Sequence, residues 1–512
     1  MDGVAIENDR SGIFDLCVIG GGINGVGIAE DAAGRGLKVV LCEQSDLGSA
    51  TSSSSSKLIH GGLRYLEHYE FGLVREALSE RETLMHRAPH LVRPLTFVLP
   101  HDPAQRPEWM IRIGLWLYDH LGHRRKLPAS RHLDLRVAPE GEPLRNRDRG
   151  GFAYPDCRVD DARLVILVAR SAAGRGAEIR TRTKVVWAGR ADGHWCVQTR
   201  VDSGAPQELW ARILVNAAGP WVESVLEKEL ALTPKRRIGL VKGSHIVVPR
   251  VHTGAQAYLL QNTDGRIVFV IPYEEQFSLI GTTEKPYVGN PAEATIDEDE
   301  IDYLLDVANR NFTHETQRQD VVWRYAGVRP LDEDEASSLS EVSRGYSLMI
   351  DGKPEEPPLL SVYGGKLTTF RRLAENALEK LRPWLPQMAK PWTAAALLPG
   401  GLAERGEPEE IAADLTRRYQ WLPAALAARY SRAYGALAGD VIGDAASFEA
   451  MGRHFGGSLY EREVAYLVLR EWARSAEDVI WRRTKQGLWL TPEEVRNLEA
   501  WLAVQVPTAT AA

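Results

Sequence analysis

A glycine-rich turn near the start of the chain limits the possible folds to a small set. It reads Cys17-Val18-Ile19-Gly20-Gly21-Gly22-Ile23-Asn24-Gly25, and the apolar stretch Val39-Val40-Leu41-Cys42 further along ends at Glu43. A buried strand that enters a Gly-x-Gly-x-x-Gly turn leaves the N–H groups of the next helix, here expected over 24–33, open to a pyrophosphate. An acid at the end of the second strand accepts the ribose hydroxyl protons. This order predicts a dinucleotide-binding fold, and the motif alone does not distinguish FAD from NAD.

Bulk properties exclude several classes of protein. The chain has 512 residues, which favours two or three domains, and its formal net charge of −7 argues against nucleic acid as a main partner. The four cysteines show neither a disulfide framework nor a metal-ligand spacing. The acidic N-terminal segment resembles neither a signal nor a transit peptide, and apolar runs such as 164–169 are too short to span a bilayer. We therefore expect a cytoplasmic protein without a metal site.

Apolar segments that recur along the chain predict that the first domain is discontinuous. Apolar strands at 211–221 and 359–369 read as returns to the dinucleotide-binding sheet, and the second runs into a helix that ends at Leu381. Between these returns, β-rich segments separated by turns predict an antiparallel sheet that covers the substrate. Amphipathic patterns after about Lys390 predict helices. We expect a doubly wound α/β domain over 12–90, 150–235 and 320–390, an antiparallel substrate domain over 91–149 and 236–319, and a helical domain over 391–512.

Clusters of polar residues beside glycines mark the expected chemistry. The run Ser52–Ser56 reads either as a flexible linker or, because a segment dense in His, Arg and Gly comes directly after it, as a phosphate contact. In that segment His60, Arg64 and Tyr65 stand within six positions around two glycines. Each of these side chains also has an ordinary structural interpretation, such as a hydrogen-bonded core histidine or a surface ion pair. Together they provide a proton acceptor and donors for an anion.

Three further clusters also combine glycine with charged or titratable residues. Arg329 stands two residues after a glycine in 323–331, and His245 closes Lys242-Gly243-Ser244-His245, where it is either a core or a site residue. Gly364 and Gly365 are expected to open a helix whose positive end stabilises negative charge on a flavin or substrate. Lysine is unfavourable at such an end, so Lys366 is expected to have a functional role.

The sequence resembles the FAD-dependent glycerol-3-phosphate dehydrogenases. The resemblance covers the first four hundred residues and is carried most specifically by Ser55-Ser56-Lys57-Leu58-Ile59-His60-Gly61-Gly62-Leu63-Arg64-Tyr65-Leu66. It becomes sparse after Gly401 and returns around 478–487, where Gln486 replaces a usual leucine. For the neighbouring Arg482, Arg483 and Lys485, the sequence leaves lipid, a partner subunit and solvent open as surroundings.

The resemblance implies a non-covalent FAD, oxidation of sn-glycerol 3-phosphate to dihydroxyacetone phosphate by hydride transfer, and a membrane quinone as electron acceptor. Arg64, Tyr65, Arg329 and Lys366 would surround the phosphate, and Thr282 or Thr283 would orient the substrate. His60 would be the base, with His245 as the second candidate. The expected catalytic residues are thus His60, His245, Arg329 and Lys366. The expected FAD contacts are Gly20, Gly21, Gly22, Asn24, Gly25, Glu43, Thr51, Ser52, Ser53, Lys57, Leu58, His60, Val185, Ala217, Gly219, Trp221, Gly327, Gly364, Gly365, Lys366, Leu367 and Thr368.

Alternatives remain for the electron acceptor, for the substrate and for whether the protein is an enzyme. An oxidase would return the electrons to dioxygen, and a regulatory protein would carry the flavin without turnover. An amino-acid oxidase on a related fold would need fewer positive groups. The stretch 109–126 combines apolar and aromatic residues with a basic end, so it reads equally as an interfacial helix or a half-buried one. We expect a homodimer with peripheral contact to the inner face of the cell membrane.

Overall fold

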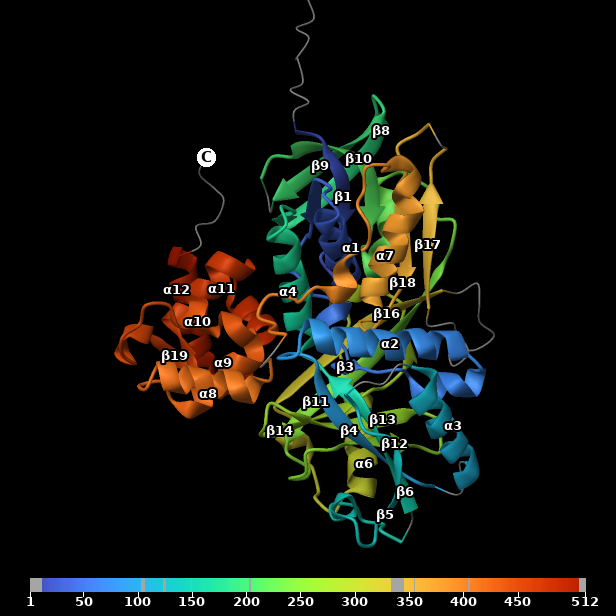
Figure 1. The fold of residues 1–512 in the computed structure, drawn as a ribbon, viewed down its shortest axis with the longest axis vertical. Coiled ribbons are helices and arrows are strands. Elements are labelled where there is room, and N and C mark those ends of the chain that lie inside the picture. Colours follow the sequence, from blue (N-terminus) through green and yellow to red (C-terminus); the bar gives the residue numbers. More distant parts are fainter. Residues whose placement is uncertain are drawn as a thin grey trace, which may run out of the picture.

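The chain forms two sheet-containing bodies and a smaller helical one. The computed structural model describes residues 12–102, 106–122, 126–148, 150–201, 204–332, 345–353, 355–403 and 406–505, without the side chains of Arg64, His68 and Asp332. Figure 1 shows the first sheet at the top, the second below it, and the helical body beside their junction. The expected class, an α/β domain with a β-rich domain and a C-terminal helical domain, is confirmed.

The first sheet has a parallel centre with antiparallel strands at its edges. Strand β1 (Phe14–Ile19) lies between β2 and β10, parallel to both. The path of the sheet is β17 (Tyr346–Asp351), β18 (Leu359–Gly364), β10 (Gln207–Asn216), β1, β2 (Val39–Cys42) and β7 (Glu178–Arg180), and the hairpin of β8 (Thr183–Ala191) and β9 (His194–Val201) pairs with β10. Both returns to the dinucleotide-binding sheet are thus confirmed, as β10 and β18.

Alternate residues of β1 supply the two faces of this sheet. Leu16 and Val18 join the core beneath three packed helices, α1 (Ile23–Gly34), α4 (Asp161–Ala173) and α7 (Phe370–Leu381). Cys17 and Ile19 join the core on the opposite face, where the β8–β9 hairpin, α5 (Val222–Ser224) and η6 (Val225–Glu229) cover the sheet. Because both faces are covered, the strand is apolar at nearly every position rather than alternating.

The second sheet is antiparallel except where β12 runs parallel to β4. Its path is β15 (Lys285–Pro286), β11 (Ile238–Pro249), β14 (Phe277–Gly281), β13 (Ile267–Tyr273), β12 (Ala257–Gln261), β4 (Arg93–Pro100), β6 (Gly150–Arg158) and β3 (Leu58–Ile59), with β16 (Trp323–Asp332) on β11 and β5 (Arg131–Asp134) on β6. One face packs on α6 (Glu298–Asn311), and the other packs on α2 (Phe71–Arg87) and α3 (Glu108–Leu121).

Three strands lie in the second sheet although the sequence places their residues in the first domain. Residues 150–158 pair with β4, 323–332 pair with β11, and 58–59 pair with β6. The local pattern of these segments does not indicate which strand each of them pairs with. The two domains therefore exchange segments more often than the predicted boundaries allow.

The C-terminal body has its own core, which the helices α8 (Pro408–Arg418), α9 (Ala424–Tyr434), α10 (Ala438–Ile442), α11 (Glu461–Glu471) and α12 (Pro492–Gln505) enclose, and it adds the short pair β19 (His454–Gly456) and β20 (Leu459–Tyr460). It contacts both sheets through η14 (Asp478–Arg483) and the residues after it. Trp481 stacks on Trp323 of β16 at 4.3 Å between ring centroids.

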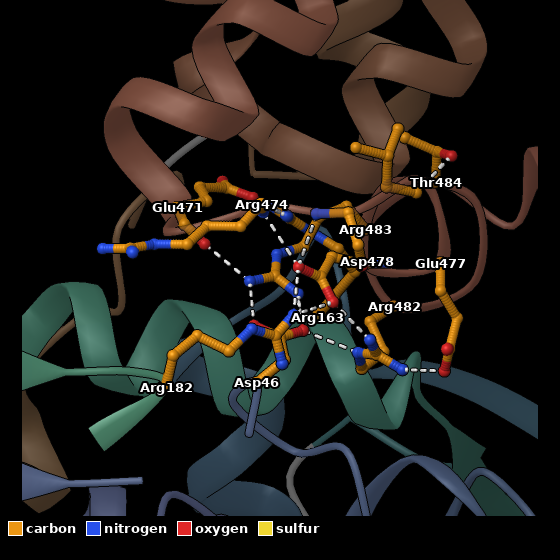
Figure 2. A network of polar contacts seen from close by, with 12 residues as sticks. Asp46, Arg163, Arg182, Glu471, Arg474, Glu477, Asp478, Arg482, Arg483 and Thr484 are labelled. Carbon is orange, nitrogen blue, oxygen red and sulfur yellow. Dashed lines mark hydrogen bonds and ion pairs between the residues drawn. The ribbon is translucent and has the colours of Figure 1, made fainter. Parts of the chain in front are cut away.

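The basic residues of this segment are buried inside the chain and do not form the solvated or lipid-facing surface that the sequence left open. Arg482, Arg483 and Lys485 are at most 7% exposed and pair with Asp46, Asp478 and Asp160 of the same chain. Figure 2 shows the two arginines with Asp46 and Asp478. Gln486, the departure from the family pattern, is also buried, and its Oε1 accepts the N–H of Ser458 at 2.7 Å. The side chain thus ties the β19–β20 turn region to η15 (Gln486–Leu488).

Candidate active site

A cavity of about 1720 Å³ lies between the two sheets and receives residues from the helical body. Its wall includes the start of α1, the ends of β2 and β18, the serine run, and parts of β11 and β16. Most of the side chains expected to form the site therefore share one space. In the part of the chain that the structure describes, no helix is long and apolar enough to cross a membrane.

The glycine-rich turn brings the N-terminus of α1 to the cavity. Gly20, Gly22, Ile23 and Asn24 line the wall, whereas Gly21 and Gly25 lie behind it. A Cβ on Gly25 would stand 2.0 Å from the carbonyl oxygen of Gly20, so only glycine permits this approach of helix to strand. The positive end of α1 consequently faces the cavity, which is the arrangement that binds a pyrophosphate.

Glu43 directly follows β2, and it stabilises the turn as well as lining the cavity. Its Oε2 accepts the N–H of Gly21 at 2.6 Å, and its Oε1 accepts the N–H of Ser45 at 2.7 Å. Burial raises the pKa of the carboxyl group, and the two backbone donors oppose that shift. Since each carboxylate oxygen has more than one acceptor site, the group retains capacity for a ribose hydroxyl.

The serine run is an ordered part of the wall rather than a linker. Ser52 Oγ accepts the N–H of Ile23 at 2.9 Å, at the start of α1. Ser55 Oγ donates to Asp161 at 2.7 Å, and Thr51 Oγ1 donates to the carbonyl of Val328 at 2.6 Å. These bonds connect the loop to α1, α4 and β16, so it holds the two sheets together around the cavity.

Lys57, expected at the cofactor, points elsewhere. Its Nζ lies 2.7 Å from Asp161 Oδ1 and donates to the carbonyl of Ser53 at 2.9 Å, and both side chains of the ion pair are buried. Neither Lys57 nor Ser53 lines the cavity. A buried ammonium needs a buried carboxylate, and Asp161, 104 residues later in the chain, provides it. Lys57 therefore supports the serine run from behind.

Lys366, Tyr65 and His60 lie along another part of the wall. Lys366 Nζ stands 4.0 Å from the centroid of the Tyr65 ring, a cation–π contact. Helix α7 begins only at Phe370, so Lys366 precedes the helix instead of occupying its first turn, and the expected conflict with the helix dipole does not arise. His60 follows β3 and neighbours Thr368 through its backbone.

The loop that carries His60 is held by a buried tyrosine on α3. The N–H of Gly61 donates to the hydroxyl of Tyr118 at 2.8 Å, and that hydroxyl donates to Asp156 at 2.7 Å. Burial raises the pKa of Tyr118, which keeps the phenol protonated and able to donate. Arg81 completes the network by donating to Asp156 at 2.7 Å. The position of His60 is thereby coupled to α3 and α2.

His245 lies on β11 with its ring at the cavity. Its Nε2 is 2.9 Å from Ser56 Oγ, and its ring stacks on Tyr325 at 4.9 Å. A Cβ on Gly281, the residue opposite it on β14, would stand 2.1 Å from the ring, so the glycine provides the space. Burial, together with the charges of Lys57 and Arg329, lowers the pKa of His245 to about 3. The imidazole is neutral at physiological pH.

Arg329 and Thr282 also line the cavity. Arg329 Nη2 lies 3.2 Å from Glu284 Oε1, and its side chain is 37% exposed. Thr283 is fully buried and donates to Glu300 at 2.6 Å, so of the two threonines only Thr282 faces the cavity. Arg64 lies in η3 (Leu63–His68), and its side chain is outside the described structure.

The remaining expected FAD contacts all lie on the cavity wall, together with several residues that were not expected there. The expected ones are Thr51, Ser52, Leu58, Val185, Ala217, Gly219, Trp221, Gly327, Gly364, Gly365, Leu367 and Thr368. The unexpected ones include Asp156, Glu284, Ser475, Glu477 and Arg482. None of these five stands in a glycine-rich motif, so no local signal distinguishes them from surface polar residues.

The residues present fit an FAD. The cavity joins the start of α1, suited to a pyrophosphate, with the carboxylate of Glu43 and with a separate wall of histidines and cations. Asn24 Oδ1 is buried at the cavity without a hydrogen-bond partner among the described residues, while its Nδ2 donates to Gly364 at 3.1 Å. A ligand with a polar edge at this point would complete the pairing.

Comparison with known proteins agrees with this geometry. Residues 15–371 match the family model of FAD dependent oxidoreductases, and residues 392–504 match the model of the C-terminal domain of alpha-glycerophosphate oxidase. The chain is 52% identical to the glycerol-3-phosphate dehydrogenase of Pseudomonas aeruginosa, over 97% of this chain and 96% of the relative. It is also 52% identical to the D-erythritol 1-phosphate dehydrogenase of Brucella abortus, over 95% and 97%.

A solved structure shows the same fold with the cofactor in place. The glycerol-3-phosphate dehydrogenase of Bacillus halodurans, complexed with FAD, superposes with a TM-score of 0.76 at 28% identity, over 96% of this chain and 90% of that one. The alignment includes the C-terminal body as well as both sheets. By its fold, its cofactor cavity and its relatives, the chain belongs to the FAD-dependent glycerol-3-phosphate dehydrogenases, within the family of FAD-dependent oxidoreductases.

Proposed function

We propose that this protein oxidises the C2 hydroxyl of sn-glycerol 3-phosphate to the ketone of dihydroxyacetone phosphate. The observation that carries the proposal is the meeting of two cations, Arg329 and Lys366, with two histidines, His60 and His245, on the wall of one FAD-sized cavity. A small phosphorylated alcohol needs both an anion site and a proton acceptor. Bound FAD would supply the acceptor for the hydride that leaves the carbon.

Arg329 and Lys366 are proposed to bind the phosphate. A guanidinium has five N–H donors, so Arg329 can keep its contact with Glu284, 3.2 Å away, and still hold two phosphate oxygens. Lys366, packed over the Tyr65 ring, adds a second full charge. Charge-assisted hydrogen bonds of this kind offset the cost of taking a dianion out of water.

His60 is proposed as the base that takes the hydroxyl proton. His245 is the weaker candidate because a pKa of about 3 leaves it little tendency to accept a proton at neutral pH. Its neutral ring, held by Ser56 and Tyr325, is instead suited to a hydrogen bond that orients the substrate. Thr282 is the second neutral group in position to do so.

D-erythritol 1-phosphate is the second candidate substrate. The Brucella abortus relative named for it is as similar to this chain as the Pseudomonas aeruginosa glycerol-3-phosphate dehydrogenase, at 52% identity each. Both substrates present a phosphate and a neighbouring secondary alcohol, so the same residues would serve either one. The longer polyol needs additional room in the cavity. The length of the pocket, and not the reacting groups, would therefore decide between the two substrates.

The electrons are proposed to pass to a membrane quinone. One exposed face of α3 supports contact with a lipid surface, because Trp109, Met110, Ile113 and Trp116 are 44–61% exposed and recur at helical spacing. Failure of the holoenzyme to sediment with anionic liposomes at low salt would contradict this contact. Residues 123–125, the basic end of the expected interfacial helix, lie outside the described structure.

Anaerobic stopped-flow absorbance tests the proposal directly. The yellow holoenzyme is mixed with sn-glycerol 3-phosphate or D-erythritol 1-phosphate, and then with a short-chain quinone or dioxygen. Faster bleaching by glycerol 3-phosphate supports the first substrate, and the reverse order supports the second. Reoxidation faster by quinone identifies a dehydrogenase, and faster by dioxygen an oxidase. A flavin that neither compound bleaches would favour a non-catalytic flavoprotein.

Three variants test the roles proposed for His60, His245 and Arg329. His60→Gln should slow flavin reduction far more than it weakens substrate binding, whereas His245→Gln should retain a larger share of the rate. Arg329→Lys keeps the charge but loses the planar fork, so it should weaken binding of the phosphorylated substrate. Equal affinity in both forms would remove Arg329 from the phosphate site. Unchanged reduction in His60→Gln would transfer the role of base to His245.

A further inference from the structure

A buried acid on the first domain is held by two arginines of the C-terminal body. Asp46 lies in the same loop as Glu43, after β2, and its side chain is fully buried. Arg482 Nε lies 2.6 Å from its Oδ2, and Arg483 Nη2 lies 2.8 Å from its Oδ1. Figure 2 shows both arginines descending from the helical body onto this one carboxylate. Because Asp46 is fully buried, loss of either arginine would leave its charge only partly compensated.

A second buried acid also connects the two bodies, but here the acid belongs to the helical body and its arginine to the first domain. Asp478 belongs to η14, and Arg182, which precedes β8, donates to both its oxygens at 2.8 and 2.7 Å. The backbone N–H groups of Arg474 and Ser475 donate to the same carboxylate at 2.8 and 3.0 Å. Arg482 contacts Asp478 as well as Asp46, so it joins the two acids into one network (Figure 2).

This network borders the carboxylate expected at the ribose. Ser45 lies next to Asp46, its N–H donates to Glu43 at 2.7 Å, and its carbonyl accepts the N–H of Arg182 at 2.9 Å. Both first-domain anchors of the network are therefore connected to Glu43, because Asp46 lies in the same loop and Arg182 donates to Ser45 of that loop. On the other side of the network, Ser475, Glu477 and Arg482 line the same cavity as Glu43 and Ser45.

We infer that the C-terminal body forms part of the FAD site, in which Ser475, Glu477 and Arg482 close the wall around the adenosine half of the cofactor. Arg482 is the central residue, because it donates to Asp46 and Asp478 and to Glu477 Oε1 at 2.7 Å. The body would then retain the cofactor by holding the Glu43 loop in place and by covering its outer side. This role concerns the cofactor alone and does not depend on which phosphorylated alcohol is oxidised.

A nearby ion pair offers a matched control. Arg163 of α4 pairs with Glu471 of α11, both side chains are buried, and the pair also connects the helical body to the first domain. Neither residue lines the cavity. Arg163→Gln and Arg482→Gln should therefore destabilise the same interface, whereas only Arg482→Gln changes the wall of the cofactor site.

The experiment compares FAD release with thermal stability in the full-length holoenzyme, without substrate. Release is followed as the rise of flavin fluorescence after dilution, and unfolding as the midpoint of a thermal melt. We expect Arg482→Gln to speed FAD release about tenfold, the effect of losing one charge-assisted contact. Arg163→Gln should lower the melting midpoint comparably and leave the release rate within about twofold of wild type. Equal acceleration in both variants, or in neither, would overturn the inference.

A surface variant decides the question if Arg482→Gln does not fold. The Glu477 side chain is 69% exposed, so Glu477→Ala removes a lining group and a partner of Arg482 without emptying a core position. It should speed FAD release by about threefold, while Glu499→Ala, a change at an exposed position of α12, should leave it unchanged. An identical release rate in Glu477→Ala and Glu499→Ala would contradict the role of this wall.

Discussion

Replacing Lys57 by methionine distinguishes a structural ion pair with Asp161 from a direct contact with the cofactor. The side chain was expected at the cofactor, but its Nζ lies 2.7 Å from Asp161 Oδ1, and the two side chains are 5% and 0% exposed. Methionine keeps the approximate length of the side chain and removes the charge. Asp161 would then be left as a buried carboxylate with hydrogen bonds from Ser55 and the N–H of Ala162 but without a counter-charge.

The cost can be worked from these contacts. Removing one partner of a buried ion pair costs about 3–5 kcal/mol, so Lys57→Met and Asp161→Asn should each lower the free energy of unfolding by that amount. The double variant leaves no charge unpaired, so its cost is that of the lost hydrogen bonds alone, about 2–3 kcal/mol in total. The sum of the single changes therefore exceeds the double change by about 3 kcal/mol or more.

Urea unfolding at saturating FAD, followed by flavin fluorescence, measures this cycle. Lys38→Met is the matched control, because Lys38 is exposed and its loss should change stability by no more than about 0.5 kcal/mol. If Lys57 instead bound the cofactor, the single variant would lose FAD affinity, and its effect would add independently to that of Asp161→Asn. Additivity within about 0.5 kcal/mol would refute the ion-pair role.

Three further single substitutions are each expected to change the stability of the protein in a defined way. Gly25→Ala places a Cβ 2.0 Å from the Gly20 carbonyl oxygen, so α1 must move away from β1, which should lower stability by about 1–3 kcal/mol and weaken FAD binding; an unchanged melt and affinity would contradict this. Gly114→Ala, in the middle of α3 with nothing beyond the adjoining helix backbone and its two chain neighbours within 4 Å of the new Cβ, should raise stability by up to about 1 kcal/mol in urea unfolding, and a loss would contradict it. Burial, together with the charge of Arg250, lowers the pKa of His252 to about 4, so the unfolded chain binds a proton below about pH 6.5 that the folded chain rejects, and stability is lost as pH falls from there to about 4. Between pH 7.5 and 5, His252→Gln should therefore lose about 2 kcal/mol less unfolding free energy than wild type, and equal losses would refute the assignment.

The parts of the fold that depend on near neighbours could be predicted from the sequence. The order β1, turn, α1, β2 and Glu43 occupies thirty consecutive residues, and apolar runs with small residues at their ends identified β10 and β18. The amphipathic periods after Lys390 likewise identified α8, α9, α11 and α12. In each case the pattern reports on a face or a strand that the segment forms by itself.

Pairings between distant residues could not be predicted. Lys57 beside a run of serines resembles a phosphate site, and only Asp161 on α4 shows that its charge is already balanced. Arg482 and Arg483 resemble a surface patch until Asp46, more than four hundred residues earlier, is placed against them. Strands 58–59, 150–158 and 323–332 pair within the second sheet, and nothing in their own sequence pattern indicates those partners.

The strand order of the first sheet has a consequence for biosynthesis. β1 is synthesised before its neighbour β10, which ends at residue 216, and before β18, which ends at residue 364. The glycine-rich turn therefore emerges long before the sheet that supports it is complete. The sheet around the FAD site is complete only once β18 has been synthesised, and a nascent chain stalled before β18 would expose an apolar sheet edge to aggregation.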